Sequence, residues 1–492
     1  MRIAWVTRSF LDYRIPVCRA LDALTGGQLH LVYSGDYVPR AVQEKAQGAL
    51  GPRAIGLRGE WKLGPEDRAY MANRNFSLRF QPGLLKMIRQ LRPDVMVCDG
   101  FFKWTFLALQ HRIRHGTPLV VLYERTAYTE RHAQWIRTFY RKFVLRFTDA
   151  MSCNGRLCKE YTVSMGFPAE RITLGHMAAD TDGMAQSAAR VPQTEIQLLR
   201  ESWLAPSALR LAPDTLRPAP DASRPAPCAQ GLVFLYVGRL NKGKGIAELL
   251  KAWEIFTKAE IPPPSTDAPS TSPLSTAPLF TDAPSTTPPR SATLVLVGSG
   301  PAEAALRHQS SVLRLPNVHF AGSVDYDKLA PYYAAADAFI IPTLEDNWSL
   351  VVPEAMACGL PILCSKYNGC WPELVHEGRN GWVFDPLDTA DTAKRLAQCA
   401  QRHAQGAGAE AGTDARTHRR TEAPAITDQF QHFSVSASHL FPSTALRAMG
   451  QESREILKDH TPHKAAEAIH RACEIAIEHR GRSCALECEK GN

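Results

Sequence analysis

Two acidic residues stand at the ends of a short interval in the second half of the chain. Asp346 opens the interval and Glu354 closes it, with seven residues between them. The apolar run Ala338 to Ile341 before Asp346 is short enough to be a buried parallel strand. Ser349 is a favourable N-cap, and Pro353 is tolerated in a helix only within the first turn. The spacing therefore predicts a strand, an acidic turn and a helix that begins near Ser349.

The start of this predicted helix has a composition that suits a sugar nucleotide. Gly359 ends the helix as the residue just past its C-cap. Free amide groups at a helix N-terminus bind phosphate oxygens. The Glu354 carboxylate can accept hydrogen bonds from sugar hydroxyls. We therefore expect a pocket for a ligand of this kind at the turn.

Three stretches resemble the nucleotide-sugar site of family 4 glycosyltransferases. The first is the acidic pair, which continues as Glu-Ala-Met-Ala-x-Gly-x-Pro, an Asn-Gly turn and Gly-Trp-x-Phe-Asp-Pro. The second is GLVFLYVGRLNKGKGIAELLKAW at 231–253, which reads as a strand, a Gly-Arg turn, a Lys-Gly step and an amphipathic helix. The third is LVLVGSGP at 294–301. The resemblance implies an α/β chain with the GT-B fold, in which two Rossmann-like domains face each other across a cleft.

The resemblance also implies roles for single residues. Arg239 and Lys244 grip the donor diphosphate, because charge-assisted hydrogen bonds are about twice as strong as neutral ones and the leaving group gains negative charge. Glu354 holds the ribose, and Asp346 contacts the transferred sugar. No metal or other cofactor is expected, because the two cations supply the positive charge. The remaining donor-binding positions are Gly238, Gly298, Glu345, Asn347, Trp348, Ser349 and Leu350.

The first acidic position departs from the family pattern. The family usually has Glu there, followed by Gly and an aromatic residue, whereas this chain has Asp346, Asn347 and Trp348, with Glu345 one place early. Either Asp346 acts with a shorter arm or Glu345 replaces it through a shifted loop, and the spacing favours Asp346. Plainer interpretations of the motifs also stand. The cations after the 231–253 strand could be solvated helix-cap residues, and Glu354 could be an acidic residue favoured by the helix dipole.

Length and composition agree with a globular enzyme of several domains. The chain has 492 residues, a hydrophobic content of 45% and a net charge of +8. No run approaches 18 consecutive apolar residues, and the N-terminus MRIAWVTRSF reads as a first strand rather than a signal peptide. The scattered cysteines form no CxxC pair and are expected to be buried reduced thiols, which indicates a cytoplasmic protein.

Alternating strand and helix patterns divide the chain into parts. The Pro-, Ala- and Thr-rich stretches lack apolar periodicity and cannot bury enough surface to offset the entropy of ordering. The resemblance implies that the final helix, from about Pro462 to His479, crosses back onto the first domain. The predicted division is an acceptor domain at 1–184, a linker or insertion at 185–230, a donor domain at 231–400 with a disordered insertion at 262–290, a low-complexity insertion at 401–430 and C-terminal helices at 431–492.

The acceptor side has weaker signals. The turn after the first strand, TRSFLDYRIP, contains no glycine, although family members commonly have a glycine-rich turn there. Glu124 and Arg125 follow a predicted strand, and His132 lies further along. We expect Glu124 and Arg125 to line the cleft, although a surface ion pair between them is an equal alternative. His132 belongs to the same region, but a solvent-facing position on a helix is the stronger prediction for it.

The stretch RHAQWIRTFYRKFVLR at 131–146 interleaves cations with aromatic residues. On a helix this pattern gives an aromatic face flanked by positive charge, which suits an anionic membrane surface. Helical periodicity alone favours a core helix instead. The membrane hypothesis places the enzyme peripherally on the inner membrane face, beside a lipid-linked acceptor. No nucleic-acid recognition module is visible.

The expected function is transfer of a sugar from a nucleotide-diphosphate sugar to an acceptor hydroxyl with retention of configuration, toward a cell-envelope glycolipid or polysaccharide. A related GT-B phosphorylase or epimerase is one alternative. A non-catalytic scaffold that binds sugar nucleotides is another; the altered first acidic position and the missing glycine turn keep it open, and the intact Arg239, Lys244 and Glu354 argue against it. The sequence leaves the nucleotide, the sugar and the acceptor open.

Overall fold

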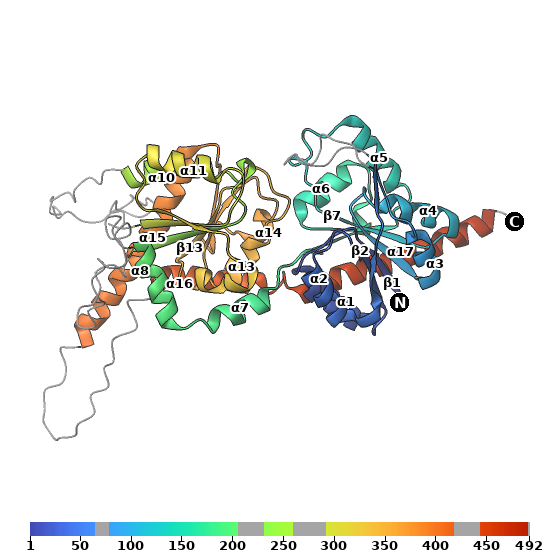
Figure 1. The fold of residues 1–492 in the computed structure, drawn as a ribbon, viewed down its shortest axis with the longest axis horizontal. Coiled ribbons are helices and arrows are strands. Elements are labelled where there is room, and N and C mark those ends of the chain that lie inside the picture. Colours follow the sequence, from blue (N-terminus) through green and yellow to red (C-terminus); the bar gives the residue numbers. More distant parts are fainter. Residues whose placement is uncertain (64–77, 205–230, 259–291, 418–442, 491–492) are drawn as a thin grey trace, which may run out of the picture.

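The computed structural model describes residues 1–63, 78–204, 231–258, 292–417 and 443–490. Two parallel sheets occupy separate halves of the molecule, each flanked by helices (Figure 1). Every ladder within these two sheets is parallel. This confirms the predicted α/β class with two Rossmann-like sheets. The predicted insertion 262–290 and most of the low-complexity segments lie outside the described residues.

The first sheet has the strand order β3-β2-β1-β6-β7-β8-β9. Its strands are continuous apolar runs whose side chains are almost all buried, as expected for a parallel sheet covered on both faces. A separate hairpin pairs β4 (Trp61–Leu63) with β5 (Leu78–Phe80). The strands are β1 (Ile3–Val6), β2 (Leu29–Ser34), β3 (Ala54–Leu57), β6 (Val95–Asp99), β7 (Leu119–Tyr123), β8 (Ala150–Cys153) and β9 (Ile172–Leu174). The helices are α1 (Arg14–Leu24), α2 (Arg40–Leu50), α3 (Leu84–Leu91), α4 (Thr105–His115), α5 (Trp135–Leu145) and α6 (Arg156–Ser164).

The second sheet has the strand order β12-β11-β10-β13-β14-β15. The strands are β10 (Leu232–Val237), β11 (Ala292–Val297), β12 (Val318–Gly322), β13 (Ala338–Ile341), β14 (Ile362–Ser365) and β15 (Gly381–Phe384). The helices are α10 (Ile246–Lys258), α11 (Glu303–Val312), α12 (Ala330–Ala334), α13 (Val351–Ala357), α14 (Trp371–Leu374), α15 (Thr389–Thr417) and α16 (Thr444–Leu457).

Each sheet reverses its strand order at one central pair. In the first sheet the reversal lies between β1 and β6, and in the second between β10 and β13. The chain leaves such neighbouring strands in opposite directions across the sheet, which opens a crevice beyond their carboxyl ends. Ligands in open parallel sheets bind at these points, so the topology marks one candidate site in each half.

The predicted boundary between the domains needs a correction. Residues 185–204, expected to belong to a linker, form most of α7 (Thr181–Ala189) and all of α8 (Gln193–Leu204). Both helices pack on the second half: α7 lies against α12 and α13, and α8 against α12 and β11. Trp203 is 1% exposed, and the buried Arg200 donates to Asp337 at 3.1 Å. The predicted insertion at 401–430 also starts differently, because α15 continues through Thr417.

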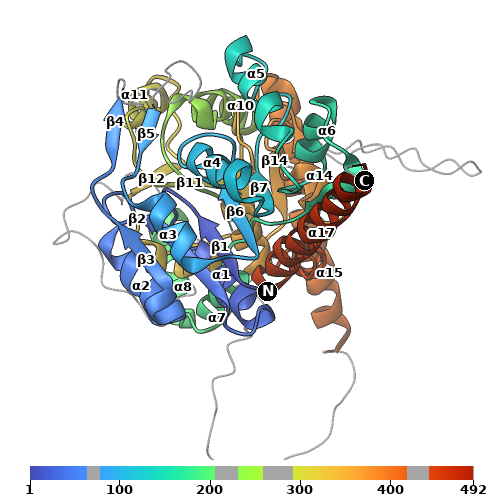
Figure 2. The same cartoon turned by 90° about the vertical axis from the view of Figure 1, so that its right-hand side faces the viewer.

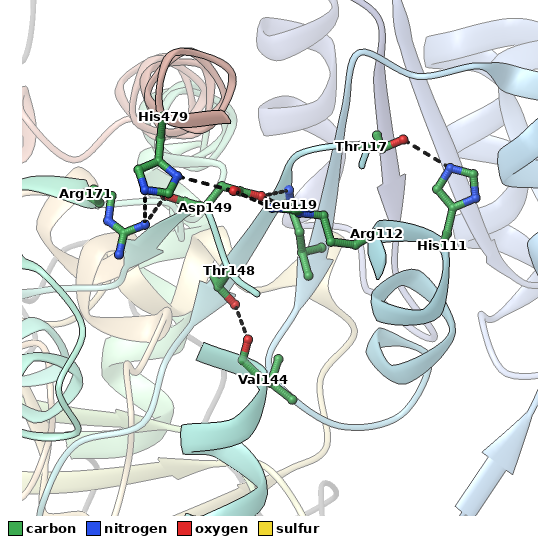
Figure 3. Close-up of polar contacts among 9 residues, drawn as sticks. All are labelled: His111, Arg112, Thr117, Leu119, Val144, Thr148, Asp149, Arg171 and His479. Carbon is green, nitrogen blue, oxygen red and sulfur yellow. Dashed lines mark hydrogen bonds and ion pairs between the residues drawn. The ribbon is translucent and has the colours of Figure 1, made fainter. Parts of the chain in front are cut away.

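The last helix, α17 (Pro462–Lys490), returns to the first half of the chain, as predicted. Figure 2 shows it lying diagonally beside the first sheet, and it contacts α1, β8 and β9. A polar cluster fastens it there (Figure 3): His479 lies between Arg171 and the buried Asp149, with Nε2 3.0 Å from Arg171 Nη1 and Nδ1 3.4 Å from Asp149 Oδ1. Arg112 binds the same carboxylate with two hydrogen bonds of 2.8 and 2.9 Å.

The described cysteine side chains are free, and all but Cys358 are buried, in agreement with the prediction. Within the described ranges, every helix is too short or too polar to traverse a lipid bilayer.

Candidate active site

The turn after β10 presents the predicted cations. Lys244 ends a short 3-10 turn, and Gly245 follows it with φ +68°. A Cβ atom on Gly245 would lie 1.9 Å from the Pro342 carbonyl oxygen, so only glycine allows the turn to approach β13 this closely. Arg239 is exposed at the start of the turn, and Gly238 donates its backbone N–H to Val297 at 3.0 Å. The tight packing therefore directs Lys244 toward the loop after β13.

Asp346 meets Lys244 in that loop, a contact that was not predicted from the sequence. Its Oδ2 atom forms an ion pair with Lys244 Nζ and accepts a 2.6 Å hydrogen bond from Ser349 Oγ. Its Oδ1 atom accepts the backbone N–H of Trp348 at 3.2 Å. Both partners of the ion pair are partly exposed, with 21% of the lysine side chain and 16% of the aspartate side chain accessible to solvent. A cation thus lies beside a braced carboxylate, within reach of a ligand.

The helix after this loop has its N-cap one residue later than predicted. The N-cap of α13 is Leu350, without a side-chain cap, and Ser349 is not the cap because its hydroxyl is bound to Asp346. Pro353 lies in the first turn and Gly359 has φ +80° just past the C-cap, both as predicted.

Glu354 is deeply buried on α13. It is 4% exposed, and its Oε2 atom accepts a 3.0 Å hydrogen bond from the Tyr333 hydroxyl. Burial raises the pKa of Glu354 to about 7, against the opposing effect of that hydrogen bond. The carboxyl group therefore changes charge near neutral pH, and it lies beneath the loop rather than on its surface.

The neighbouring predicted positions have separate environments. Glu345 turns away from Asp346 and pairs with Arg131 of the first half at 3.0 Å, so it does not replace Asp346 through a shifted loop. Trp348 is buried, and Asn347 has a buried Oδ1 atom without a hydrogen-bond partner. Gly298 donates to the Gly322 carbonyl at 2.7 Å in the turn beside Gly238.

The first half contributes a second pocket at its own strand reversal. Glu124 lines this pocket and Arg125 does not; a role of Glu124 toward an acceptor stays a prediction. Arg125 instead lies 3.6 Å from Glu130, so the alternative of an ion pair with Glu124 is wrong. His132 is exposed and does not line the pocket, so its predicted solvent exposure is confirmed, but it lies in the turn before α5 rather than on a helix.

Several residues of the site were not predicted from the sequence. Arg14, Asp99 and Lys103 line the pocket with Glu124. Asp99 is the last residue of β6, and the carboxyl end of a central parallel strand was a usable signal. The pairing of Arg131 with Glu345 had no such signal, because it joins residues from different domains.

One loop connects the two candidate sites. It follows β7 and includes Tyr128, whose ring stacks on that of Tyr367 in the second half at 4.6 Å between centroids. The Arg131 guanidinium lies over the Tyr128 ring at 3.8 Å and reaches Glu345. Helices α6 and α14 also touch across the two halves (Figure 1). Among the described residues, no three His, Cys, Asp or Glu side chains gather in a way that could hold a metal ion.

Two parallel Rossmann-like sheets, with sites at both strand reversals, define the GT-B fold. Anabaena Alr3699/HepE, solved in complex with UDP-glucose, matches it with a TM-score of 0.58 and 14% sequence identity, over 96% of this chain and 99% of that one. The model for group 1 glycosyl transferases matches residues 278–402, and the model for a glycosyl transferase 4-like domain matches residues 16–176. The chain therefore carries glycosyltransferase domains of the group 1, family 4-like type.

Curated relatives match a shorter part of the sequence. The sulfoquinovosyl transferase SQD2 of Arabidopsis thaliana is 32% identical over 108 residues, which is 21% of this chain and 20% of the relative. The D-inositol 3-phosphate glycosyltransferase 2 of Catenulispora acidiphila is 31% identical over 115 residues, 22% of this chain and 27% of the relative. The matches thus span well under a third of either relative.

Proposed function

We propose that this chain is a retaining glycosyltransferase that moves a sugar from a nucleotide-diphosphate sugar to an acceptor hydroxyl. The observation that carries the proposal is the meeting of Lys244 and Asp346 at the strand reversal of the second sheet. A diphosphate at this point competes with Asp346 for the ammonium group. The carboxylate, still held by Ser349, is then free to accept hydroxyls of the sugar.

The proposed reaction breaks the bond between the anomeric carbon and the terminal phosphate oxygen. The acceptor oxygen bonds to that carbon on the same face, and the departing phosphate oxygen takes the acceptor proton. Lys244 and Arg239 meet the negative charge that develops on the leaving diphosphate, so the reaction needs no metal ion. Glu354, next to the loop, holds the ribose of the donor in this proposal. Residues between the two halves exclude water when the domains close.

A UDP-sugar is the donor we propose, since the neighbouring fold of Alr3699/HepE was solved with UDP-glucose. Thermal shift of the purified chain against UDP-, GDP-, ADP- and dTDP-sugars tests the donor. A ligand at a hundred times its dissociation constant adds about 2.7 kcal/mol of stability. The Lys244→Ala variant should lose this shift, and Lys242→Ala, an exposed lysine of the same turn, should keep it.

The outcomes separate the alternatives. Absence of a shift with all four classes, in a protein that melts cooperatively, favours a scaffold over an enzyme. A shift accompanied by phosphorolysis or epimerisation of the donor in product analysis contradicts transfer.

We also propose that α5 places the enzyme on an anionic membrane surface, beside a lipid-linked acceptor on its inner face. Trp135, Phe139 and Phe143 recur every four residues and form an exposed face, with Trp135 79% and Phe139 67% accessible, so the core-helix prediction is wrong for them. Lys142 and Arg146 beside this face are exposed as well.

Two of the cations in the 131–146 stretch form ion pairs within the protein instead of facing the membrane surface. Arg141 is 2% exposed and pairs with Glu130 at 2.6 Å, and Arg131 is bound to Glu345. The aromatic face therefore has to contribute more of the binding to the membrane, relative to the cations, than the sequence suggested. Flotation with vesicles of phosphatidylglycerol and phosphatidylcholine tests it. Binding should fall in Phe139→Ser and persist in Leu198→Ser, because Leu198 lies on α8 and has a nearly equal exposure of 66%. Equal flotation of both variants would refute this surface.

A further inference from the structure

Helices α6 and α14 meet where the two halves of the chain come together (Figure 1). Gly155 is the N-cap of α6 and has no side chain that could cap it, and the first turn of α6 contains no acidic residue. The first amide groups of a helix have no partner within the helix itself. An acceptor for these amide groups therefore has to come from another part of the chain or from water.

The second half supplies this acceptor through Glu373. Glu373 belongs to α14, and its Oε1 atom accepts a hydrogen bond from the backbone N–H of Arg156, the first residue of α6. A carboxylate at a helix N-terminus also interacts favourably with the helix dipole. One half of the protein thus caps a helix of the other half.

Gly155 leaves room for this contact. A Cβ atom at this position would lie 2.8 Å from Glu373 Oε1 and 2.8 Å from the ring of Trp348. Gly155 has φ −162°, an extended conformation that any residue adopts, so the backbone itself does not require a glycine. The close approach of α14 and of Trp348 to the start of α6 accounts for the glycine instead.

The segment before Glu373 is joined to the donor loop, residues 345–350 between β13 and α13. The backbone carbonyl of Asp346 accepts the N–H of Gly369 at 3.0 Å. The N–H of Asp346 donates to the Tyr367 carbonyl at 3.2 Å. Backbone hydrogen bonds therefore hold the donor loop and the start of α14 together, and Glu373 attaches both to the first half.

The contact between Glu373 and Arg156 is suited to opening and closing. Glu373 Oε2 is buried and has no hydrogen-bond partner among the described residues. Burial raises the pKa of Glu373, although the hydrogen bond from Arg156 acts against this rise. Because a buried carboxylate oxygen without a donor costs free energy, the contact joins the two halves without locking them. Such a contact can break and form again in each catalytic cycle, as entry of the donor and release of the products require.

We propose that Glu373 is a positioning residue for sugar transfer, which holds the donor loop against the first half by capping α6. This role rests on the glycosyltransferase function proposed above. Lys244 and Asp346 meet the donor within the second half, so binding of the donor does not need Glu373. Transfer needs both halves, and a displacement of about 1 Å can lower a reaction rate about 100-fold.

Hydrogen exchange on the full chain tests the contact without any acceptor. The amide of Arg156 should exchange slowly, and the UDP-sugar that stabilises the protein should slow it further. In Glu373→Ala the exchange rate at Arg156 should rise about tenfold or more and should no longer respond to the UDP-sugar. Glu373→Gln should keep most of the protection, because its amide oxygen still accepts the N–H. Glu303→Ala, which removes a carboxylate from the first turn of α11, should leave the exchange at Arg156 unchanged.

Rates of sugar transfer separate positioning from binding. The donor is the same UDP-sugar, and the acceptors are a mixture of octyl glucoside, octyl galactoside and octyl mannoside. In Glu373→Ala, kcat should fall about tenfold or more, while KM for the donor should stay within about twofold. Gly155→Ala should lower kcat from the other side of the contact, because its Cβ meets Glu373 and Trp348. The variant with both substitutions should be about as slow as the slower single variant, since both break one contact.

Unchanged exchange at Arg156 in Glu373→Ala would overturn the proposal, as would a rise in KM with kcat unchanged or full activity of Gly155→Ala. The donor thermal shift of the unchanged protein is a separate measurement. Its absence contradicts the glycosyltransferase function, whereas its presence together with unchanged exchange contradicts only the role of Glu373. The two failures are therefore distinguishable.

Discussion

Replacing Glu354 by Gln should change how the stability of the protein depends on pH. The carboxyl group is 4% exposed, and burial raises its pKa from 4.5 to about 7. Below pH 4.5 the group is protonated in both the folded and the unfolded chain. Between pH 4.5 and 7 the unfolded chain loses the proton while the folded chain keeps it, so the free energy of unfolding falls as the pH rises.

The size of the effect follows from the shift. Each tenfold change in a protonation equilibrium corresponds to 1.36 kcal/mol, so the rise of the pKa from 4.5 to about 7 makes the charged group cost about 3 kcal/mol above pH 7. Gln has the same shape and its carbonyl can still accept from Tyr333, but it does not titrate. The free energy of unfolding of Glu354→Gln, minus that of the unchanged protein, should therefore rise by about 3 kcal/mol from pH 4.5 to 8.

Urea unfolding at several pH values between 4.5 and 8 measures this difference. Buried histidines act in the opposite direction: burial lowers the pKa of His176 to about 3 and that of His111 to about 4, so stability falls as the pH drops below 6.5. Both proteins contain these histidines, and subtraction removes their contribution. Glu303→Gln, on α11 at the surface, reports the effect of an equivalent substitution at an accessible site. A difference that stays constant within about 1 kcal/mol would refute the buried, uncharged carboxyl group.

Three further perturbations have defined outcomes. Asp149→Asn should lower the free energy of unfolding by about 3–5 kcal/mol, because it leaves the buried charge of Arg112 unmatched. His479→Gln should lower it much less, and urea unfolding compares the two variants. Gly245→Ala should lower the free energy of unfolding by at least about 1–2 kcal/mol for the left-handed backbone alone. Because the added Cβ would meet the Pro342 carbonyl, the variant should also lose the thermal shift with the donor. An unchanged thermal shift would contradict the tight turn. EDTA should leave the rate of sugar transfer unchanged, because cationic side chains meet the diphosphate; a loss that added magnesium restores would disprove metal independence.

The sequence predicted the parts of the fold that depend on local patterns. Continuous apolar runs placed β1 within the first ten residues and located β13 to the residue, because buried parallel strands consist of such runs. Lys244 and Asp346 were each predicted to face the donor, from motifs that follow neighbouring strands, although their pairing with each other was not predicted. In each case the signal lies within a few residues of the structure that it predicts.

Features that depend on distant contacts were not predictable in this way. Helices α7 and α8 are short, and their apolar residues, such as Trp203, are explained only by the second half on which they pack. The salt bridge of Arg131 with Glu345 requires knowledge of how the two halves sit together. Ser349 had the right composition for an N-cap, but its hydroxyl is bound to a carboxylate that the sequence alone could not place against it.

The unusual aspartate at the first acidic position is explained by the loop that surrounds it. The Asp346 side chain accepts the N–H of Trp348, two residues ahead, which is an Asx-turn that the short aspartate arm can form. Ser349 then donates to the other carboxylate oxygen. A glutamate has one more methylene and moves its carboxylate away from both donors. The short aspartate, which departs from the family pattern, therefore fits a loop whose own donors hold its carboxylate.

This interpretation makes a prediction that runs against the family pattern. Asp346→Glu restores the residue that the family usually has, yet it should weaken binding of the donor, because the longer side chain loses the Trp348 N–H and the brace from Ser349. Thermal shift with the UDP-sugar that stabilises the unchanged protein measures the loss, and Asp327→Glu, outside the loop, serves as the matched control. A larger shift in Asp346→Glu than in the unchanged protein would mean that the carboxylate acts through its reach to the sugar, and that the Asx-turn contributes nothing to the site.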